Sequence, residues 1–116
     1  MLYSPAMIYR FGEYELDTAK LELKGRGAAV AVEPQVFALL RLLIENRERA
    51  LTKEEIIERV WDGRFISDAA VASRIKSARQ AIGDDGQAQK LIKTLHGVGF
   101  RFVADVTKVE LARIET

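Results

Sequence analysis

Hydrophobic and polar positions alternate in period two through the first quarter of the chain. Four short runs show this pattern: Ile8–Phe11, Tyr14–Leu16, Leu21–Leu23 and Ala29–Val32. Turn residues separate the runs, notably Gly12, the segment Asp17–Lys20 and Gly25–Gly27. Because successive side chains of a strand point to opposite faces, the alternation predicts a small antiparallel meander with one apolar face.

The hydrophobic period then becomes that of a helix. Apolar residues share one helical face from Pro34 onward: Val36, Phe37, Leu40, Leu43 and Ile44. A second helix opens at Thr52, which forms a T-x-x-E capping box with Glu55, and it stops at Asp62-Gly63. A third helix is expected from Ser67 or Asp68 to about Ile82, with Gly83 ending it.

Two strands are expected after the helices, over Leu91–Leu95 and Phe100–Val103, with the glycine-bearing tip His96–Gly99 between them. The order is therefore meander, three helices and hairpin. A short loop containing Gly63 joins the second and third helices. This order is typical of a helix-turn-helix followed by a β-hairpin wing.

Particular residues also resemble a known family. The segments that carry the likeness are Pro34–Leu40, Leu51–Ile56, Val60-Trp61 and the wing Leu91–Phe102, which contains T-x-x-G-x-G-F-R-F. They are similar to OmpR/PhoB-type winged helix-turn-helix domains. The resemblance implies an α+β fold over residues 8–104: an N-terminal antiparallel four-stranded sheet, three helices and a C-terminal β-hairpin wing. It also implies sequence-specific binding of double-stranded DNA in bacterial transcriptional regulation.

The sequence departs from this family pattern in three places. Glu33 stands where a Ser or Thr often caps the first helix, and His96 stands where an arginine is common at the wing tip. The third helix is rich in Ala and Ser, where many relatives carry several arginines. These departures affect the expected base preferences more than the expected fold.

Composition narrows the function classes. The chain has 116 residues, no cysteine and one histidine, so disulfides, thiolate metal sites and clusters of histidines are excluded. Glu54-Glu55 and Asp84-Asp85 are sequence neighbours that cannot act as a catalytic carboxylate pair, and there is no phosphate-binding loop. We therefore expect no enzyme, cofactor or metal. No apolar run approaches a membrane span and no signal peptide is evident, so a cytoplasmic location is expected.

Charge is distributed unevenly along the chain. The net charge is +1, but residues 64–101 carry seven basic and three acidic side chains, a local balance of +4. A local excess of cations is what a polyanionic partner would respond to, because screening confines the field to about 8 Å. An unevenly charged but merely solvated surface is the alternative interpretation.

A helical wheel divides the third helix, about residues 68–82, into two sides. Val71, Ile75, Ala78 and Ile82 cluster on one side and are expected to pack on the body of the domain. Ser73, Lys76 and Ser77 lie opposite, where short side chains suit a major groove roughly 12 Å wide. The family motif gives the same division. We therefore predict that Ser73, Lys76 and Ser77 contact bases, with mere solubility as the alternative role for the serines.

A second set of side chains is predicted to contact DNA phosphates: Arg64, Arg74, Arg79, Thr94, His96 and Arg101. Arg74 and Arg79 flank the third helix, and Arg64 lies in the loop before it, where a guanidinium can bind a phosphate. The other three belong to the wing, residues 91–103, which the resemblance places on the adjacent minor groove or backbone. Trp61, Phe37, Leu40 and Phe102 are expected in the core rather than on the binding surface.

The resemblance also implies partners. Regulators of this kind usually bind as a homodimer or tandem pair on promoter DNA, and the loop Asp62–Phe65 is a candidate contact for RNA polymerase. No receiver domain precedes the motif, so we expect one-component regulation, with residues 105–116 as a tail or linker toward a C-terminal sensory domain. The alternatives are a complete stand-alone regulator and a winged-helix protein–protein interaction module without DNA binding.

Overall fold

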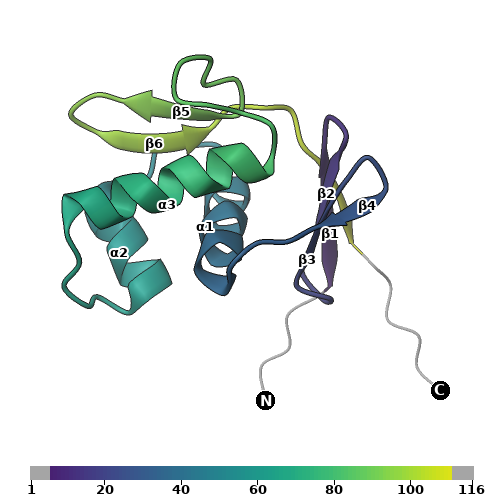
Figure 1. The fold of residues 1–116 in the computed structure, drawn as a ribbon, viewed down its shortest axis with the longest axis horizontal. Helices are drawn as coiled ribbons and strands as arrows, with labels where there is room; N and C mark the ends of the chain where they lie inside the picture. The colour runs from purple at the N-terminus through teal and green to yellow at the C-terminus, as the bar shows by residue number, and fades with distance from the viewer. Residues whose placement is uncertain (1–5, 111–116) are drawn as a thin grey trace.

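The computed structural model describes residues 6–110, which form three helices and two antiparallel sheets (Figure 1). The elements run in the order β1 (Met7–Phe11), β2 (Tyr14–Asp17), β3 (Glu22–Gly25), β4 (Ala28–Val30), α1 (Pro34–Glu45), α2 (Lys53–Trp61), α3 (Asp68–Ala81), β5 (Ile92–Leu95), β6 (Gly99–Phe102) and β7 (Thr107–Glu110). The predicted α+β winged helix-turn-helix fold is confirmed.

The N-terminal sheet has one strand more than the sequence analysis expected. Its order is β4-β3-β2-β1-β7, so the predicted meander is present and β7 is added along the free side of β1. Val109 of β7 is opposite Ile8 of β1 in an antiparallel pair. The prediction of residues 105–116 as a tail or linker is therefore wrong for Thr107–Glu110. This edge strand has a single half-buried apolar residue, Val109, and gives no periodic signal in the sequence.

The helix boundaries follow from local capping chemistry. Thr52 accepts a hydrogen bond from the Glu55 backbone N–H at 3.1 Å, and the Glu55 carboxylate accepts from the Thr52 N–H at 3.0 Å, so the predicted capping box is present. The side chain of Ser67 accepts from the Ala70 N–H at the start of α3. Glu33, by contrast, makes no side-chain cap at α1, where Pro34 occupies the first turn.

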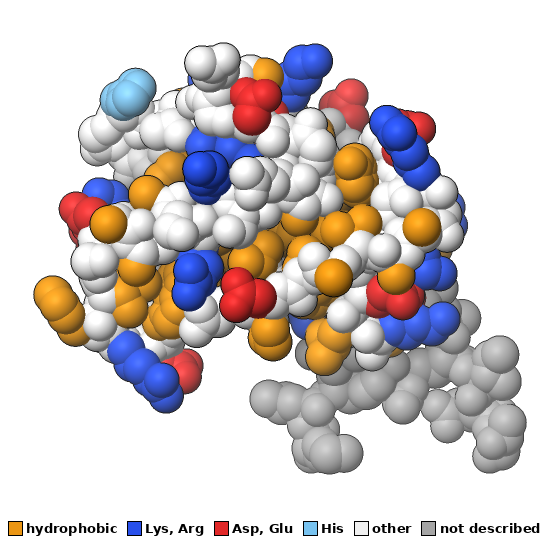
Figure 2. Space-filling view, in the orientation of Figure 1, with side chains coloured by type: hydrophobic (Ala, Val, Ile, Leu, Met, Phe, Trp, Pro, Cys, Tyr) orange, Lys and Arg blue, Asp and Glu red, His pale blue; other side chains and the backbone are white. Residues whose placement is uncertain are grey.

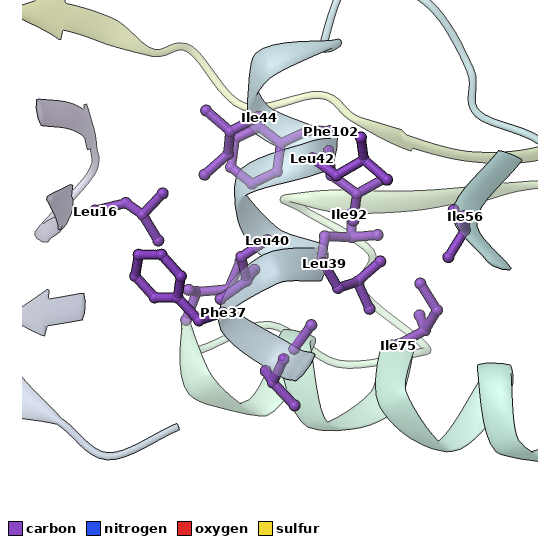
Figure 3. Packing of buried hydrophobic residues seen from close by; sticks show 14 of the residues in the cluster. Leu16, Phe37, Leu39, Leu40, Leu42, Ile44, Ile56, Ile75, Ile92 and Phe102 are labelled. Atoms are coloured by element: carbon purple, nitrogen blue, oxygen red, sulfur yellow. The ribbon is translucent and has the colours of Figure 1, made fainter. Parts of the chain in front are cut away.

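The hydrophobic core surrounds α1. In Figure 3, side chains of α1 meet Leu16 from the sheet on one side, and Ile92 and Phe102 from the hairpin and Ile75 from α3 on others. Phe102 also packs edge-on against Phe11, with ring centroids 5.2 Å apart. Trp61, Phe37, Leu40 and Phe102 are all buried, as predicted. The core therefore joins the sheet, the helices and the hairpin into one body.

The hairpin β5–β6 lies above α3 in Figure 1 and forms the wing. On its inner side, β6 is extended by a bridge in which Leu51 and Phe100 exchange backbone hydrogen bonds of 2.7 and 2.9 Å. A Cβ on Gly99 would collide with the carbonyl oxygen of Leu51, so this close approach requires glycine. The bridge fixes the wing to the segment that precedes α2.

Candidate nucleic-acid interface

The outward face of α3 is built from small polar side chains and one lysine. Ser73, Lys76 and Gln80 are exposed, and Ser77 is half-buried beside the start of α1. Figure 2 views this side of the molecule, and the surface over α3 is largely white with separate blue cationic groups. No element of the described chain covers this face. A helix about 10–12 Å in diameter with short central side chains fits a DNA major groove.

The opposite face of α3 fixes the orientation of the helix. Val71, Ile75, Ala78 and Ile82 are at most 1% exposed, as the helical wheel predicted. They fill the core against α1, whose apolar face includes Leu39. Ser73 and Lys76 must therefore project away from the domain.

Two of the predicted phosphate ligands flank the exposed face of α3. Arg64 is exposed in the loop before α3, and Asp68, at the first turn of the helix, is paired with Lys53 at 3.2 Å rather than with Arg64. The Arg74 Nε donates to Oε1 of Gln35 at 3.2 Å, which holds its side chain along the boundary between α3 and α1. Both guanidinium groups therefore retain donors for an anion.

Arg79 lies deeper than its expected position on a flank of the helix. It is only 8% exposed. Its Nε and Nη2 donate to the carbonyl oxygen of Ile92 at 3.1 and 3.0 Å, and Nη2 also donates to Thr94 Oγ1 at 2.9 Å. Burial lowers the pKa of Arg79 against the opposing effect of Asp84. Only its Nη1, beside Gly86, remains without a protein partner in the part of the chain described.

The wing presents its predicted contacts at different depths. His96 is exposed at the hairpin tip, and Thr94, two residues before it on β5, is half-buried. Because the Thr94 hydroxyl accepts from Arg79, its own hydrogen is free to donate. Arg101 is exposed on β6, where its Nε donates to the carbonyl oxygen of Arg47 at 2.9 Å. Arg101 therefore leans toward the segment that follows α1.

The cations of this region have no acidic partners. Across residues 6–110, six ion pairs form, and their cations are Arg10, Lys24, Arg26, Arg41, Arg49 and Lys53. None of the seven basic side chains of residues 64–101 pairs with a carboxylate within the described chain. The local excess of positive charge is thus not neutralised by the domain itself, which favours an anionic partner.

Sequence reasoning missed two side chains that shape this surface. Asp84 is 6% exposed and accepts backbone hydrogen bonds from Lys90, Leu91 and Ile92 at 2.8–3.0 Å. Burial would raise the pKa of Asp84, but these backbone donors, together with that of Asp85, outweigh it and hold the pKa below its usual value. Gln89 Oε1 accepts from the Thr94 N–H at 2.9 Å. In the sequence, Asp84 stood out only as an acidic neighbour of Asp85, and Gln89 gave no signal.

Comparison with known proteins identifies the family. Residues 27–102 match the family described as "Transcriptional regulatory protein, C terminal". The chain belongs to this family. The match covers α1 to β6 and includes every predicted contact residue, so the resemblance to OmpR/PhoB-type domains is confirmed.

Relatives of this transcriptional regulatory domain are longer than the chain. The regulatory protein TrcR of Mycobacterium tuberculosis is 33% identical over 92 residues, which are 78% of this chain and 35% of TrcR. The activator IrlR of Burkholderia pseudomallei is 34% identical over 94 residues, covering 80% of the chain and 41% of IrlR. The chain thus spans about two fifths of the length of these curated relatives.

Solved structures share the fold of this regulatory domain. The OmpR/PhoB homologue DrrB of Thermotoga maritima superposes with a TM-score of 0.75 at 32% identity, covering 82% of this chain and 43% of DrrB. The Klebsiella pneumoniae RstA DNA-binding domain, solved with its RstA box, gives 0.73 at 21% identity and covers 82% and 95% of the two chains. At the latter identity the likeness concerns the fold alone. Among the residues described, no helix has the length and apolar character needed to cross a membrane.

Proposed function

We propose that this domain binds double-stranded promoter DNA sequence-specifically and regulates bacterial transcription. The observation that supports it most is the coincidence of two features within residues 64–101. The exposed face of α3 is uncovered, and the seven cations of residues 64–101 have no carboxylate partner in the described chain. An uncovered helix bordered by uncompensated cations suits a groove lined with phosphates.

In the proposed complex, α3 enters the major groove. Ser73, Lys76 and Ser77 meet base edges; a serine can donate or accept, and Lys76 can reach the O6 or N7 atom of guanine. Ser77 is the least accessible of the three, because it lies beside the start of α1. Base reading is therefore assigned mainly to Ser73 and Lys76. The wing lies on the adjacent minor groove or backbone.

Phosphate contacts are proposed on both borders of the helix. Arg64 and Arg74 reach one strand, and His96 and the Thr94 hydroxyl reach the backbone beside the wing. Arg79 has its Nε and Nη2 engaged within the protein, so its proposed share is limited to Nη1, in a hollow that Lys76 and Gln80 also line. Arg101 is the weakest of the set because it is directed toward Arg47.

The names of relatives support this function. TrcR is named as a transcriptional regulatory protein and IrlR as a transcriptional activator. By analogy, we propose that two copies bind neighbouring half-sites. We further propose a cytoplasmic, non-enzymatic role within a longer protein, in which the chain beyond β7 leads toward a sensory domain. We also propose RNA polymerase as a partner of the loop Asp62–Phe65, in which Phe65 is 98% exposed.

Selection of bound oligonucleotides from a random pool, at two salt concentrations, tests the proposal. We expect an enriched motif with half-sites about ten base pairs apart. If about five phosphates are neutralised per protomer, log K falls against log salt with a slope near −4 to −5. No enriched motif and a slope near zero would support the alternative, a protein–protein interaction module.

A further inference from the structure

The outer edge of β5 is paired with side chains instead of a neighbouring strand. The Ile92 N–H donates to Asp84 Oδ2 at 3.0 Å, and the Ile92 carbonyl oxygen accepts two hydrogen bonds from the Arg79 guanidinium. One register step on, the Thr94 N–H donates to Gln89 Oε1 at 2.9 Å. We call Arg79, Asp84 and Gln89 the edge clamp.

The clamp residues come from α3 and the segment that leaves it. Arg79 lies in the last turn of α3, Asp84 follows two residues after Ile82, the C-cap of the helix, and Gln89 lies in the loop before β5. The side chains therefore connect the end of α3 directly to the first strand of the wing. Because a buried carboxylate and a buried guanidinium are both involved, losing a partner would leave a charged group unsatisfied.

The wing would otherwise be a two-stranded hairpin, and such a hairpin is marginally stable alone. Its inner edge is held at Leu51 and its outer edge at Ile92, so both sides of the hairpin are attached. The inner attachment leads to the segment before α2. Of the two edges, only the outer one, through the clamp, is hydrogen-bonded to the end of α3.

We propose that the edge clamp sets the position of the wing relative to α3, so that both reach DNA as one preorganised unit. This inference rests on the proposed function. Arg79, Asp84 and Gln89 are positioning residues in this role: their effect on DNA passes through the wing. A wing already held in its bound position loses less conformational freedom on binding, which strengthens association.

A double electron–electron resonance experiment on the folded chain tests whether the edge clamp sets the position of the wing relative to α3. The chain has no cysteine, so two spin labels can be introduced at engineered cysteines. The substitutions are Ala72→Cys on α3 and Val98→Cys at the wing tip, and both positions are exposed. We expect Asp84→Asn and Gln89→Leu to broaden the α3–wing distance distribution. The pair Ala72→Cys and Ala38→Cys, which spans α3 and α1, should keep its distribution in the same variants.

Measurements of DNA affinity, with a matched control variant, test whether this positioning strengthens DNA binding. Asp84→Asn and Asp85→Asn each remove one negative charge from adjacent positions, and on charge alone both should tighten DNA binding. The exposed Asp85 accepts only within its own turn, from Gln87 and Ala88. We expect Asp84→Asn to weaken binding by about tenfold, our order-of-magnitude estimate for a wing that must be ordered on binding, while Asp85→Asn binds equally or more tightly. Gln89→Leu, which changes no charge, should also weaken DNA binding when it is measured without spin labels.

The outcomes separate the two proposals. An unchanged α3–wing distribution in folded Asp84→Asn and Gln89→Leu overturns the clamp's positional role. A broadened distribution with unchanged or tighter DNA binding in both variants overturns its role in binding. If the unsubstituted chain fails to bind any duplex, the proposed function fails, and the distance measurement still decides whether the clamp positions the wing.

Discussion

The N-terminal sheet and the α3–wing region differ in whether their cations are paired with carboxylates. The sheet pairs Arg10 with Glu15, Lys24 with Glu22 and Arg26 with Glu13, at 3.1–3.8 Å. In residues 64–101 no cation has a carboxylate partner in the described chain, although three acidic side chains lie in the same segment. Three cations of the sheet region are thus paired with nearby carboxylates, whereas the cations of residues 64–101 remain available to an external anion.

Acidic side chains in the two regions differ as well. Glu13 and Glu15 neutralise cations across the sheet surface. Asp84 instead binds backbone N–H groups at the start of the wing. Its charge stabilises local structure without removing a cation from the surface. Acidic side chains thus pair with surface cations in the sheet, whereas in the α3–wing region Asp84 leaves the surface cations unpaired.

The largest expected effect is a charge reversal on α3. Lys76→Glu should weaken DNA binding by on the order of 100-fold at ~0.1 M salt, because a base or phosphate contact contributes about 1–3 kcal/mol and the reversal adds repulsion. Fluorescence anisotropy on the selected duplex measures this change. Lys24→Glu, the same reversal in the sheet, is the matched control and should change the affinity less than threefold, by our estimate for a charge remote from the duplex. Equal losses in both variants would mean that no particular face binds DNA.

The second expected effect concerns stability and its pH dependence. Asp84→Asn should lower the free energy of unfolding by about 2–3 kcal/mol, because three backbone donors lose an anionic acceptor in a buried site. Since the pKa of Asp84 is lowered in the folded state, its contribution is present above the unfolded value and is lost as pH falls through the folded value. Melting temperatures between about pH 6 and pH 2 should therefore fall less steeply for Asp84→Asn. Parallel curves would contradict this role.

Most of the fold could be predicted from the sequence because its signals are local. The capping box at Thr52, the apolar period of α1 and the glycine-bearing wing tip each arise from neighbouring residues, and all are confirmed. Strand β7 could not be predicted in this way. Its pairing with β1 joins residues about a hundred positions apart, and one half-buried valine gives no periodic signal.

The site was predictable only in outline. A helical wheel separates the buried Val71 and Ile75 from the exposed Ser73 and Lys76, as the structure confirms. The wheel could not show that Arg79 is drawn inward, because the group responsible is a backbone carbonyl on a strand 13 residues away. Which bases or phosphates these side chains contact remains a prediction.

A third, smaller effect distinguishes phosphate contacts from base contacts. Arg64→Gln should weaken binding uniformly across duplex sequences and reduce the magnitude of the salt slope by about 1, because one phosphate contact is lost. Ser73→Ala should leave the salt slope unchanged and alter the relative affinities of duplexes that differ at one base pair. Titrations at several salt concentrations on a small panel of duplexes measure both. If the two variants showed the same salt slopes and the same relative affinities, the proposed division into phosphate and base contacts would be wrong.

The smallest expected effect tests the sheet side of the comparison. The pair Arg26–Glu13 joins side chains that are 78% and 63% exposed, so water screens both charges. Arg26→Gln should therefore change the free energy of unfolding by less than about 0.5 kcal/mol, and DNA affinity should remain the same within measurement. Chemical denaturation and anisotropy check the two quantities. A pair this weak does not stabilise the sheet. Its consequence is that the charge of Arg26 is offset by that of Glu13 at the surface. If Arg26→Gln weakened DNA binding as much as Arg64→Gln, the sheet's cations would also be available to DNA despite their partners, and the contrast between the two regions would not hold.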